Sequence, residues 1–569
     1  MSEQTPPPPP PPGPPAPEAA APAVPPPPPD DTPAAGTSGS GRGKKAVIGG
    51  IAAALVLGGG YGAYAVYDRL DGGGPQPHDV MPASTEVYAR VDLDPSASQK
   101  IDLFRLIRKV PDLASEIGIK DEDQDIRELV FGEILSSECD DVDYDTDVEP
   151  WLGDRIGVGG SITDETFLIA VQTTDEDASR EGIKKIFECS GDPYGIAYLD
   201  GYALVSDQQK TVDEAVAATA KGTLGDRKEF ADDIDELGNQ GVASAWADVA
   251  AIAESPAIAE QLGAQATELA KSGTIATTLR ADGNAIELAV LGGFESVGDA
   301  SATPLSALPA DTVAALSIAG VGDQVTEAFD SFVKEFDSAF NNPGMASPTP
   351  IDPPGSSTSD PTDPTDPLAG DDPFGGDFGP GTFSTQNFID EIERNTGFKL
   401  PEDLATLFGD SLTLAIGAEN LETLPTLSGP DAFGTLDVAL SLKSDQASAL
   451  DLVQRIATLA ESAGIPLVAS PTDDGAVLAT NQGAADAVAE PDGALGDDDV
   501  FTSVIPDGDS AYGGLYVNIG TILDKLLEAD PPPDVRSGIE QASSLSALGA
   551  SVSQQDGDRS LTRLRLSFK

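Results

Sequence analysis

Few residues of this chain have the type and spacing that chemistry requires. His78 is the only histidine among the 569 residues, and it falls in the segment 68–78, which we interpret as a linker. A His-based catalytic triad or a histidine-rich zinc site therefore cannot form inside a folded unit. The sequence also contains no phosphate-binding loop and no dinucleotide-binding glycine fingerprint. We expect no cofactor and no metal.

A Ser-x-x-Lys pattern at Ser331 and Lys334 comes nearest to an active site. Ser/Lys acyl transferases combine this pattern with a later Lys-Thr-Gly strand and a Ser-x-Asn motif. Here the similar Lys271-Ser272-Gly273 comes before the Ser-x-x-Lys pattern, and no Ser-x-Asn motif lies properly between the two. Since Ser-x-x-Lys occurs by chance on amphipathic helices, we predict that the protein is not an enzyme. An enzyme built on this chain would have to use carboxylates, Ser or Lys.

An alternating acidic run precedes Trp151 and consists of Asp141, Asp143, Asp145, Asp147 and Glu149. In an extended strand these five carboxylates would point to one side, as calcium ligands do. The run lacks the glycine and the bidentate glutamate of an EF-hand loop. We expect a solvated acidic loop here.

The composition is strongly acidic, with 96 Asp and Glu against 32 Lys and Arg and a formal net charge of -64. Binding to nucleic acid requires clustered Lys and Arg that displace counterions from phosphate. Nucleic-acid binding is therefore excluded. The charge favours solubility or tolerance of salt and divalent cations, with a cationic partner as the alternative.

The first 67 residues predict a membrane anchor. Residues 1–45 are rich in Pro, Ala, Gly and Ser, which predicts a disordered, extended tail. Residues 46–67 carry no charge, and a helix of this length spans roughly 30 Å, the thickness of a bilayer core. Three basic residues lie before this segment, at Arg42, Lys44 and Lys45. By the positive-inside rule, the tail is cytoplasmic and the C-terminal part lies outside the cell membrane.

A cleaved signal peptide is the alternative to an anchor, because Ala63-Tyr64-Ala65 has the form of a cleavage site. The 41 residues before the first basic residue are too many for an ordinary signal peptide, so an uncleaved anchor is favoured. Gly58 and Gly62 form a GxxxG pattern that could pair two such helices, although small residues are common in spans.

The chain has two cysteines, Cys139 and Cys189, and both fall on the exported side of the predicted span. An oxidising compartment favours a disulfide between them, which would close a loop of about 50 residues and stabilise the fold by roughly 3 to 4 kcal/mol. Two free buried thiols are the alternative.

The exported part reads as a tandem duplication. WLGDRIGVGG from Trp151 matches LFGDSLTLAIG from Leu407, and the match extends in both directions in the same order. Further pairs along the chain are Met81 with Leu308, Asp200 with Asp474, Phe230 with Phe501 and Thr278 with Ser551. We interpret the shared Gly-Asp pair as a turn between a helix and a strand. This is a structural role, and we favour it over an active site.

The offset between the copies is 227 residues at Pro82 and 256 at Gly153, so the second copy carries about 29 additional residues. A stretch rich in Pro, Asp and Gly at 341–386 accounts for them, and we predict a disordered insertion. The predicted divisions are therefore tail 1–45, transmembrane helix 46–67, linker 68–78, first repeat 79–296 and second repeat 306–569.

Within each copy, short strands such as 87–91, 167–171 and 202–205 alternate with helical stretches such as 103–110 and 256–271. Hydrophobic alternation and Asp-Gly turns favour antiparallel pairing. The fold class is α+β, with helices covering one face of a curved antiparallel sheet.

The proline-rich tail, the single span, MPASTEVYARVDLDP after it, EPWLGDRIGVGG and LFGDSLTLAIG together resemble an uncharacterised actinobacterial family of single-pass membrane proteins. The resemblance covers roughly residues 45–569, and EPWLGDR is its most specific motif. It implies a domain-of-unknown-function ectodomain at the cell envelope and no site residues.

We therefore expect a non-catalytic envelope protein whose duplicated ectodomain serves as a binding or scaffold domain. Its expected partners are the lipid bilayer, through the span, and an envelope protein or a lipid ligand. The alternative is a membrane-tethered carrier or sensor of a lipid or other apolar ligand, held between sheet and helices. This alternative rests on analogy at the level of the fold.

Overall fold

The computed structural model describes most of the chain from Pro75 to Lys569. The described residues are 75–93, 106, 109, 127–128, 131, 135, 139, 141–238, 240–292, 305–341, 385–426, 434–508, 510–555 and 559–569. The predicted tail and span, with linker residues 68–74 and most of the insertion, lie outside them. Within the described ranges no helix is both long and apolar enough to cross a bilayer. The chain divides into Met1–Gly43 and Lys44–Lys569, and only the second unit is described below.

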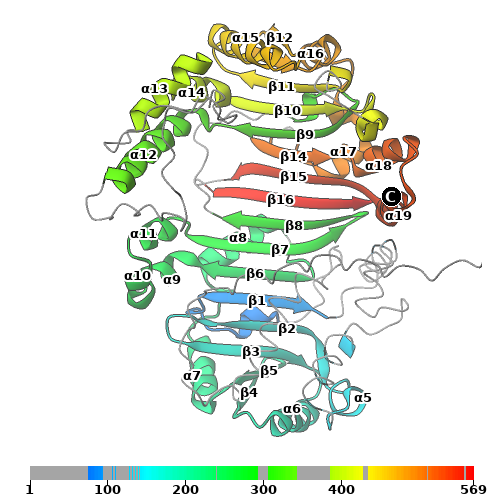
Figure 1. The fold of residues 1–569 in the computed structure, drawn as a ribbon. Helices are drawn as coiled ribbons and strands as arrows, with labels where there is room; N and C mark the ends of the chain where they lie inside the picture. Colours follow the sequence, from blue (N-terminus) through cyan, green and yellow to red (C-terminus); the bar gives the residue numbers. More distant parts are fainter. Residues whose placement is uncertain are drawn as a thin grey trace, which may run out of the picture. The chain divides into compact units, whose positions relative to one another are not determined.

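One antiparallel sheet of 16 strands forms the centre of the second unit, as Figure 1 shows. The predicted α+β class with an antiparallel sheet is confirmed. The first eight strands are β1 (Val87–Asp92), β2 (Leu152–Ser161), β3 (Thr166–Thr173), β4 (Gly195–Leu199), β5 (Tyr202–Ser206), β6 (Ala243–Asp248), β7 (Thr274–Asp282) and β8 (Ala285–Gly292). The last eight are β9 (Thr312–Ala319), β10 (Ser411–Gly417), β11 (Val438–Lys443), β12 (Val468–Thr472), β13 (Gly475–Ala479), β14 (Gly513–Val517), β15 (Leu545–Gln555) and β16 (Arg559–Phe568).

The two series of strands follow the same spatial order. From its outer edge to the middle, the first series runs β4-β5-β3-β2-β1-β6-β7-β8, and the second runs β12-β13-β11-β10-β9-β14-β15-β16. Each strand of the second series thus takes the place of the strand eight positions earlier. β8 and β16 pair with each other and join the two halves into one sheet.

The helices connect or cover the strands (Figure 1). In the first half they are η1 (Pro77–Val80), α5 (Tyr144–Asp147), α6 (Glu176–Ser190), α7 (Gln209–Thr219), α8 (Lys228–Leu237), α9 (Val249–Glu254), α10 (Pro256–Leu262) and α11 (Ala264–Ala270). In the second half they are η2 (Leu305–Ala307), α12 (Gly322–Asn341), α13 (Thr385–Thr396), α14 (Glu402–Phe408), η3 (Leu421–Thr426), α15 (Gln446–Ser462), α16 (Gln482–Ala489), η5 (Leu495–Asp497), α17 (Asp499–Val504), α18 (Ile519–Glu528), α19 (Pro533–Gln541) and η6 (Ala542–Ser544).

The sheet has two faces with different cover. We call the side that carries Leu316, Leu564 and Leu288 the leucine face, and the other side the opposite face. On the leucine face, α6 packs over the outer strands of the first half and α15 over those of the second. On the opposite face, α7 and α8 cover the first half, while α16 and α17 cover the second. The expectation that helices cover one face is wrong, because strands with apolar side chains on both sides need cover on both.

The junction between the halves contains a buried ion-pair network. Glu287 of β8 is 2 % exposed and lies directly across from Arg565 of β16. Its carboxylate accepts a hydrogen bond from Arg565 Nη1 at 2.8 Å and another from Arg280 Nε at 2.9 Å. Farther along the same two strands, Leu291 pairs with Leu561, and both are buried. Polar and apolar pairs thus both hold the two halves together.

Candidate apolar binding site

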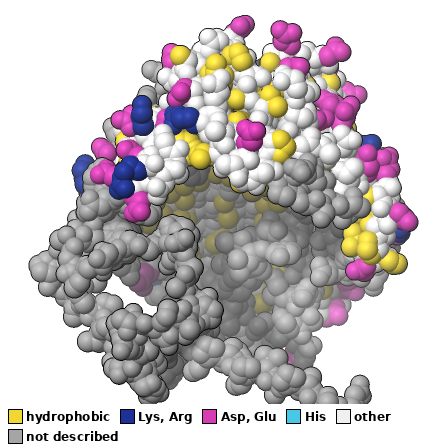
Figure 2. Space-filling view, turned by 45° about the horizontal axis from the view of Figure 1, so that its top comes forward, with side chains coloured by type: hydrophobic (Ala, Val, Ile, Leu, Met, Phe, Trp, Pro, Cys, Tyr) yellow, Lys and Arg dark blue, Asp and Glu magenta, His cyan; other side chains and the backbone are white. Residues whose placement is uncertain are grey.

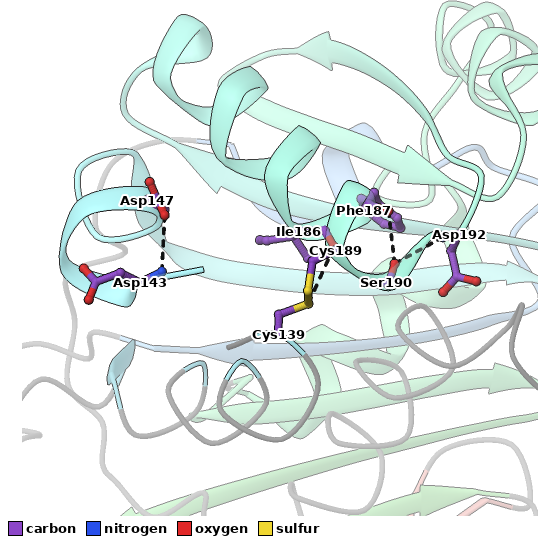
Figure 3. Close-up of a disulfide and its surroundings, with 8 residues drawn as sticks. All are labelled: Cys139, Asp143, Asp147, Ile186, Phe187, Cys189, Ser190 and Asp192. Atoms are coloured by element: carbon purple, nitrogen blue, oxygen red, sulfur yellow. Dashed lines mark hydrogen bonds between the residues drawn. A yellow bond between two sulfur atoms is a disulfide. The ribbon is translucent and has the colours of Figure 1, made fainter. Parts of the chain in front are cut away.

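A disulfide joins Cys139 to Cys189, the pair that the sequence favours. The Cα atoms lie 5.8 Å apart, within the usual range for a disulfide. Figure 3 shows Cys189 at the end of α6, with Cys139 below it and Ile186 beside it. Cys139 belongs to the core on the leucine face of the first half. The bond therefore fixes α6 to a distant part of the chain, which is a structural role.

The acidic run before Trp151 is exposed, as expected for a solvated segment, except at Asp147, and a short helix at Tyr144–Asp147 interrupts the loop. Asp143 caps α5 by accepting a hydrogen bond from the Thr146 amide at 3.0 Å. Lys185 hydrogen-bonds the Asp147 carboxylate and lowers the pKa of that group. The alternation of carboxylates to one side of a strand is therefore not realised. Among the residues that the structure describes, no group of three or more His, Cys, Asp or Glu side chains could hold a metal ion.

The residues of the Ser/Lys pattern lie on separate helix groups. Ser331 and Lys334 are exposed on α12, which contacts α13 and α14. Lys271 follows α11, which contacts α9 and α10, and its ammonium pairs with Glu268 at 2.7 Å. Ser331 and Lys334 therefore belong to one group of helices and Lys271 to another.

His78 does not lie in a linker as expected, because η1 is packed into the first half. Its side chain is 12 % exposed, and its ring centroid lies 5.0 Å from that of Phe230. Burial lowers the pKa of His78, with Asp79 acting in the opposite direction and Arg90 reinforcing the decrease. The packing of His78 could not be predicted, because a lone histidine after a Gly and Pro stretch resembles a linker residue.

The two Gly-Asp pairs occupy related but unequal places. Gly409 ends α14 with φ 39° just before β10, which is the predicted turn between a helix and a strand. Gly153 instead lies inside the irregular start of β2. A Cβ on either glycine would collide with the following strand, 2.8 Å from Gln172 Cγ or 2.2 Å from the Lys443 carbonyl oxygen. Close approach of two strands explains both glycines.

In the central strands, large apolar side chains are exposed to solvent, and the polar side chains next to them are buried. Leu316 of β9 is 42 % exposed, whereas Ser317 beside it is 2 % exposed. In β16, Leu564 is 42 % exposed and Arg565 is 7 % exposed. This order is the reverse of the usual pattern in a half-buried strand. Such an exposed apolar patch is typical of a binding surface.

The exposed leucines form a row across the strands. Cross-strand partners share one face of a sheet, so each pair extends the row to the next strand. The pairs link Leu316 of β9, Leu515 of β14, Ala550 of β15, Leu564 of β16, Leu288 of β8 and Leu279 of β7. The row contains no charged residue and crosses the junction between the halves.

A hollow of about 480 Å³ lies on the leucine face over β9, β14, β15 and β16. Its volume falls in the range of small-molecule binding pockets. The hollow exists because Gly513 has no side chain between Ile318 and Val552, its partners on the two neighbouring strands. Ala550, in the next row, is also small. We call this feature the β14 hollow.

Hydroxyl groups lie at one side of the β14 hollow. Tyr512, Ser560 and Thr562 are among its lining residues. The Tyr512 hydroxyl hydrogen-bonds the Ser560 side chain, and burial raises the pKa of Tyr512. These groups remain neutral at ordinary pH and can hydrogen-bond a neutral polar group of a ligand. The site can therefore bind a molecule that is mostly apolar and has a polar end.

A second cavity of about 660 Å³ reaches the opposite face of the second half. Its lining includes Thr413, Ser441 and Lys443, and the Lys443 ammonium pairs with Asp474 at 3.0 Å. Its lining is mixed in polarity, whereas that of the β14 hollow is almost wholly apolar.

The sequence did not point to the β14 hollow. Two features of the sequence belong to it: GGLYV at β14, where the corresponding strand β6 has ASAWAD, and the alternation of Leu with Arg or Ser in β16. The first feature marks a missing side chain, and the second marks strands that bury their polar residues.

No protein-family model matches this chain, and no curated protein matches it. Among solved structures, crystal forms III and IV of TP0453 are similar over 40 % and 39 % of this chain, and 82 % and 81 % of theirs, at 11 % identity. Crystal form I covers 41 % of this chain and 82 % of its own at 12 % identity. The TM-score is 0.20 in each case, which is too low for the likeness to bear on fold or function.

Proposed function

We propose that the protein is a non-catalytic, single-pass membrane protein of the cell envelope that carries or senses a lipid. Its extracytoplasmic part would bind a lipid acyl chain in the β14 hollow. The observation that carries this proposal is the apolar hollow of about 480 Å³ on a sheet face whose leucines are exposed. A general binding or scaffold role does not account for that hollow.

The chemistry of the site favours an alkyl chain over a charged ligand. Leu316, Ile318 and Val552 contribute apolar surface, and the lining includes no charged residue. Each methylene buried there would contribute about 0.8 kcal/mol. Figure 2 shows Asp and Glu side chains spread over the described part of the face in view, where Lys and Arg are fewer. Such a surface disfavours docking flat on an anionic membrane, so a single chain is a better occupant than a bilayer surface.

The length of the tether supports a lipid as the source of that chain. Residues 68–74 separate the predicted span from Pro75, whose carbonyl accepts a hydrogen bond from the Tyr202 hydroxyl at 2.8 Å. Seven extended residues reach at most about 25 Å. The anchor would therefore hold the folded unit close to the outer surface of the membrane, where lipid chains are the most abundant apolar ligands.

We also propose that the two halves arose by duplication. The identical strand order of the two series supports this, as do the matched sequence pairs. Equivalent aromatic contacts add to it: Phe230 packs on Trp246 in the first half, and Phe501 packs on Tyr516 in the second. On this view one copy retained a filled core and the other developed the β14 hollow.

Native mass spectrometry of residues 75–569, exported across the membrane of a host cell and purified without detergent, tests the lipid proposal. We expect an adduct with the mass of an acyl lipid. Gly513→Leu should remove it, since a Cβ there meets only the Ser317 carbonyl oxygen, at 3.4 Å, and the added side chain fills the hollow. The matched control is Gly538→Leu on α19, where a Cβ meets nothing within 4 Å. A clean apo mass for the unsubstituted protein would contradict the proposal and favour a protein partner.

A further inference from the structure

The row of leucines continues beyond the β14 hollow and indicates the shape of its ligand. From Leu316 the row passes through the hollow to Leu564 of β16 and then to Leu288 of β8. Leu564 is 42 % exposed and Leu288 is 38 % exposed, although both lie outside the lining of the hollow. A compact apolar molecule in the hollow would leave both leucines in water.

The geometry of the sheet sets the length of this path. Neighbouring strands lie about 4.8 Å apart, so the four steps from β9 to β8 span about 19 Å. The path is perpendicular to the strands and has no charged residue on it. An extended long-chain acyl group is the lipid component that fits a narrow, straight, uncharged path of this length.

We infer that the ligand is a long unbranched acyl chain that lies across the strands, with its polar end in the β14 hollow and its tail over Leu564 and Leu288. The inference rests on the proposed function and adds the orientation and the chain class. The hydroxyls of Tyr512, Ser560 and Thr562 place the polar end in the hollow. The exposed Leu564 of β16 and Leu288 of β8 contact the tail. The first half of the sheet therefore contributes to a site whose hollow belongs to the second half.

Photo-crosslinking tests this orientation with the full chain in nanodiscs of phosphatidylcholine and phosphatidylglycerol. One phospholipid probe carries a diazirine near the ester, and a second carries it at the end of the acyl chain. We expect the first to label the lining of the hollow, on β9, on β14 and at Ser560 and Thr562 of β16. The second should label β16 at Leu564 and β8 at Leu288. Labelling of residues 46–67 by both probes reports that lipid is present and reactive.

Leu288→Asn sharpens the test. It should reduce labelling of β8 and β16 by the chain-end probe by about fivefold, the order expected for one lost leucine contact. Labelling of β9 and β14 by the ester-end probe should persist, which shows that the variant is folded. Leu424→Asn on η3, where the leucine is 40 % exposed outside this row, is the matched control.

The outcomes separate the two levels of the proposal. If both probes label only the lining of the hollow, a ligand binds but the long-chain orientation is wrong. If residues 46–67 are labelled and the sheet is not, the proposed function itself fails. If the chain-end probe labels β9 while the ester-end probe labels β8, the acyl path holds and the assignment of its polar end is overturned.

Discussion

The two halves of the sheet share one strand order but fill it differently. In the first half, Trp246 of β6 is buried, packs on Phe230, and donates a hydrogen bond from Nε1 to the buried Asp233 at 2.7 Å. In the second half, Tyr516 of β14 takes the equivalent place and packs on Phe501. The aromatic pair is common to both halves, and in the first half it is joined to a buried carboxylate through Trp246.

The two halves also differ on the leucine face, where the first half buries more of its apolar side chains around the matched strands. In the first half, Val91 of β1, the strand that corresponds to β9, packs against a core that holds Phe187 of α6 and the disulfide-linked Cys139. In the second half, Ile318 of β9 is 38 % exposed beside the β14 hollow. The comparison teaches that the first half covers the inner strands of its leucine face with a core around α6 and the disulfide, while the second half leaves apolar surface open at the β14 hollow.

Trp246→Ala should give the largest loss of stability. It creates a cavity beside Phe230 and removes a donor from buried Asp233, so we expect a cost of about 4 kcal/mol in the free energy of unfolding. Asp233 also pairs with Arg559 of β16 at 2.7 Å, so the loss extends to the junction. Guanidinium denaturation measures it, with Tyr516→Ala as the matched variant in the second half. Equal losses for the two variants would contradict the difference between the halves.

Glu287→Gln should weaken the junction by about 3 kcal/mol, because two arginines then lose their buried counter-charge. Asp282 pairs with Arg565 at 2.8 Å in the same network, but its side chain is 62 % exposed. Asp282→Asn should therefore cost less than about 1 kcal/mol. Chemical denaturation of both variants checks this order. If Glu287→Gln costs no more than Asp282→Asn, the network does not hold the halves together.

His78→Leu should flatten the dependence of stability on pH. Because burial lowers the pKa of His78 below its ordinary value of 6.5, the unfolded chain binds a proton that the folded chain does not. Stability should therefore fall as the pH drops below about 6.5, until the folded histidine also becomes protonated. Leucine is the residue 227 positions later, at Leu305, the offset that separates the matched sequences at Pro82 and Pro309. Melting temperatures between about pH 8 and 5 report the change, and an unchanged pH dependence in the variant would contradict it.

Much of the secondary structure could be predicted from the sequence because it follows from local patterns. The strand predicted at 202–205 is β5, and the turn at Asp282-Gly283 joins β7 to β8. The helix predicted over 256–271 is broken at Gly263, where φ is 58°. Local hydrophobic spacing gives no warning of a break that a glycine permits.

The candidate site could not be predicted, because the alternation of apolar and polar residues in its strands assigns the leucines to the buried face. In β16 the pattern of Leu with Arg indicates that leucines face the core and arginines face water. The structure reverses this, because Arg565 finds a buried partner in Glu287, 278 positions away in the sequence. A partner at that separation becomes visible only when β8 and β16 are placed side by side.

The central claim is that the β14 hollow binds an acyl lipid. Protection of a single thiol placed in the hollow tests this claim most directly. Both native cysteines are in the disulfide, so Ala550→Cys provides the one free thiol of the described chain. Addition of monopalmitoylglycerol, an uncharged palmitoyl ester, to the delipidated protein should slow maleimide modification of this thiol by about tenfold, as expected for an occupied site. A thiol at the exposed Ser543→Cys should react at an unchanged rate. Equal rates at the Ala550→Cys thiol with and without monopalmitoylglycerol would show that the hollow does not bind an acyl lipid.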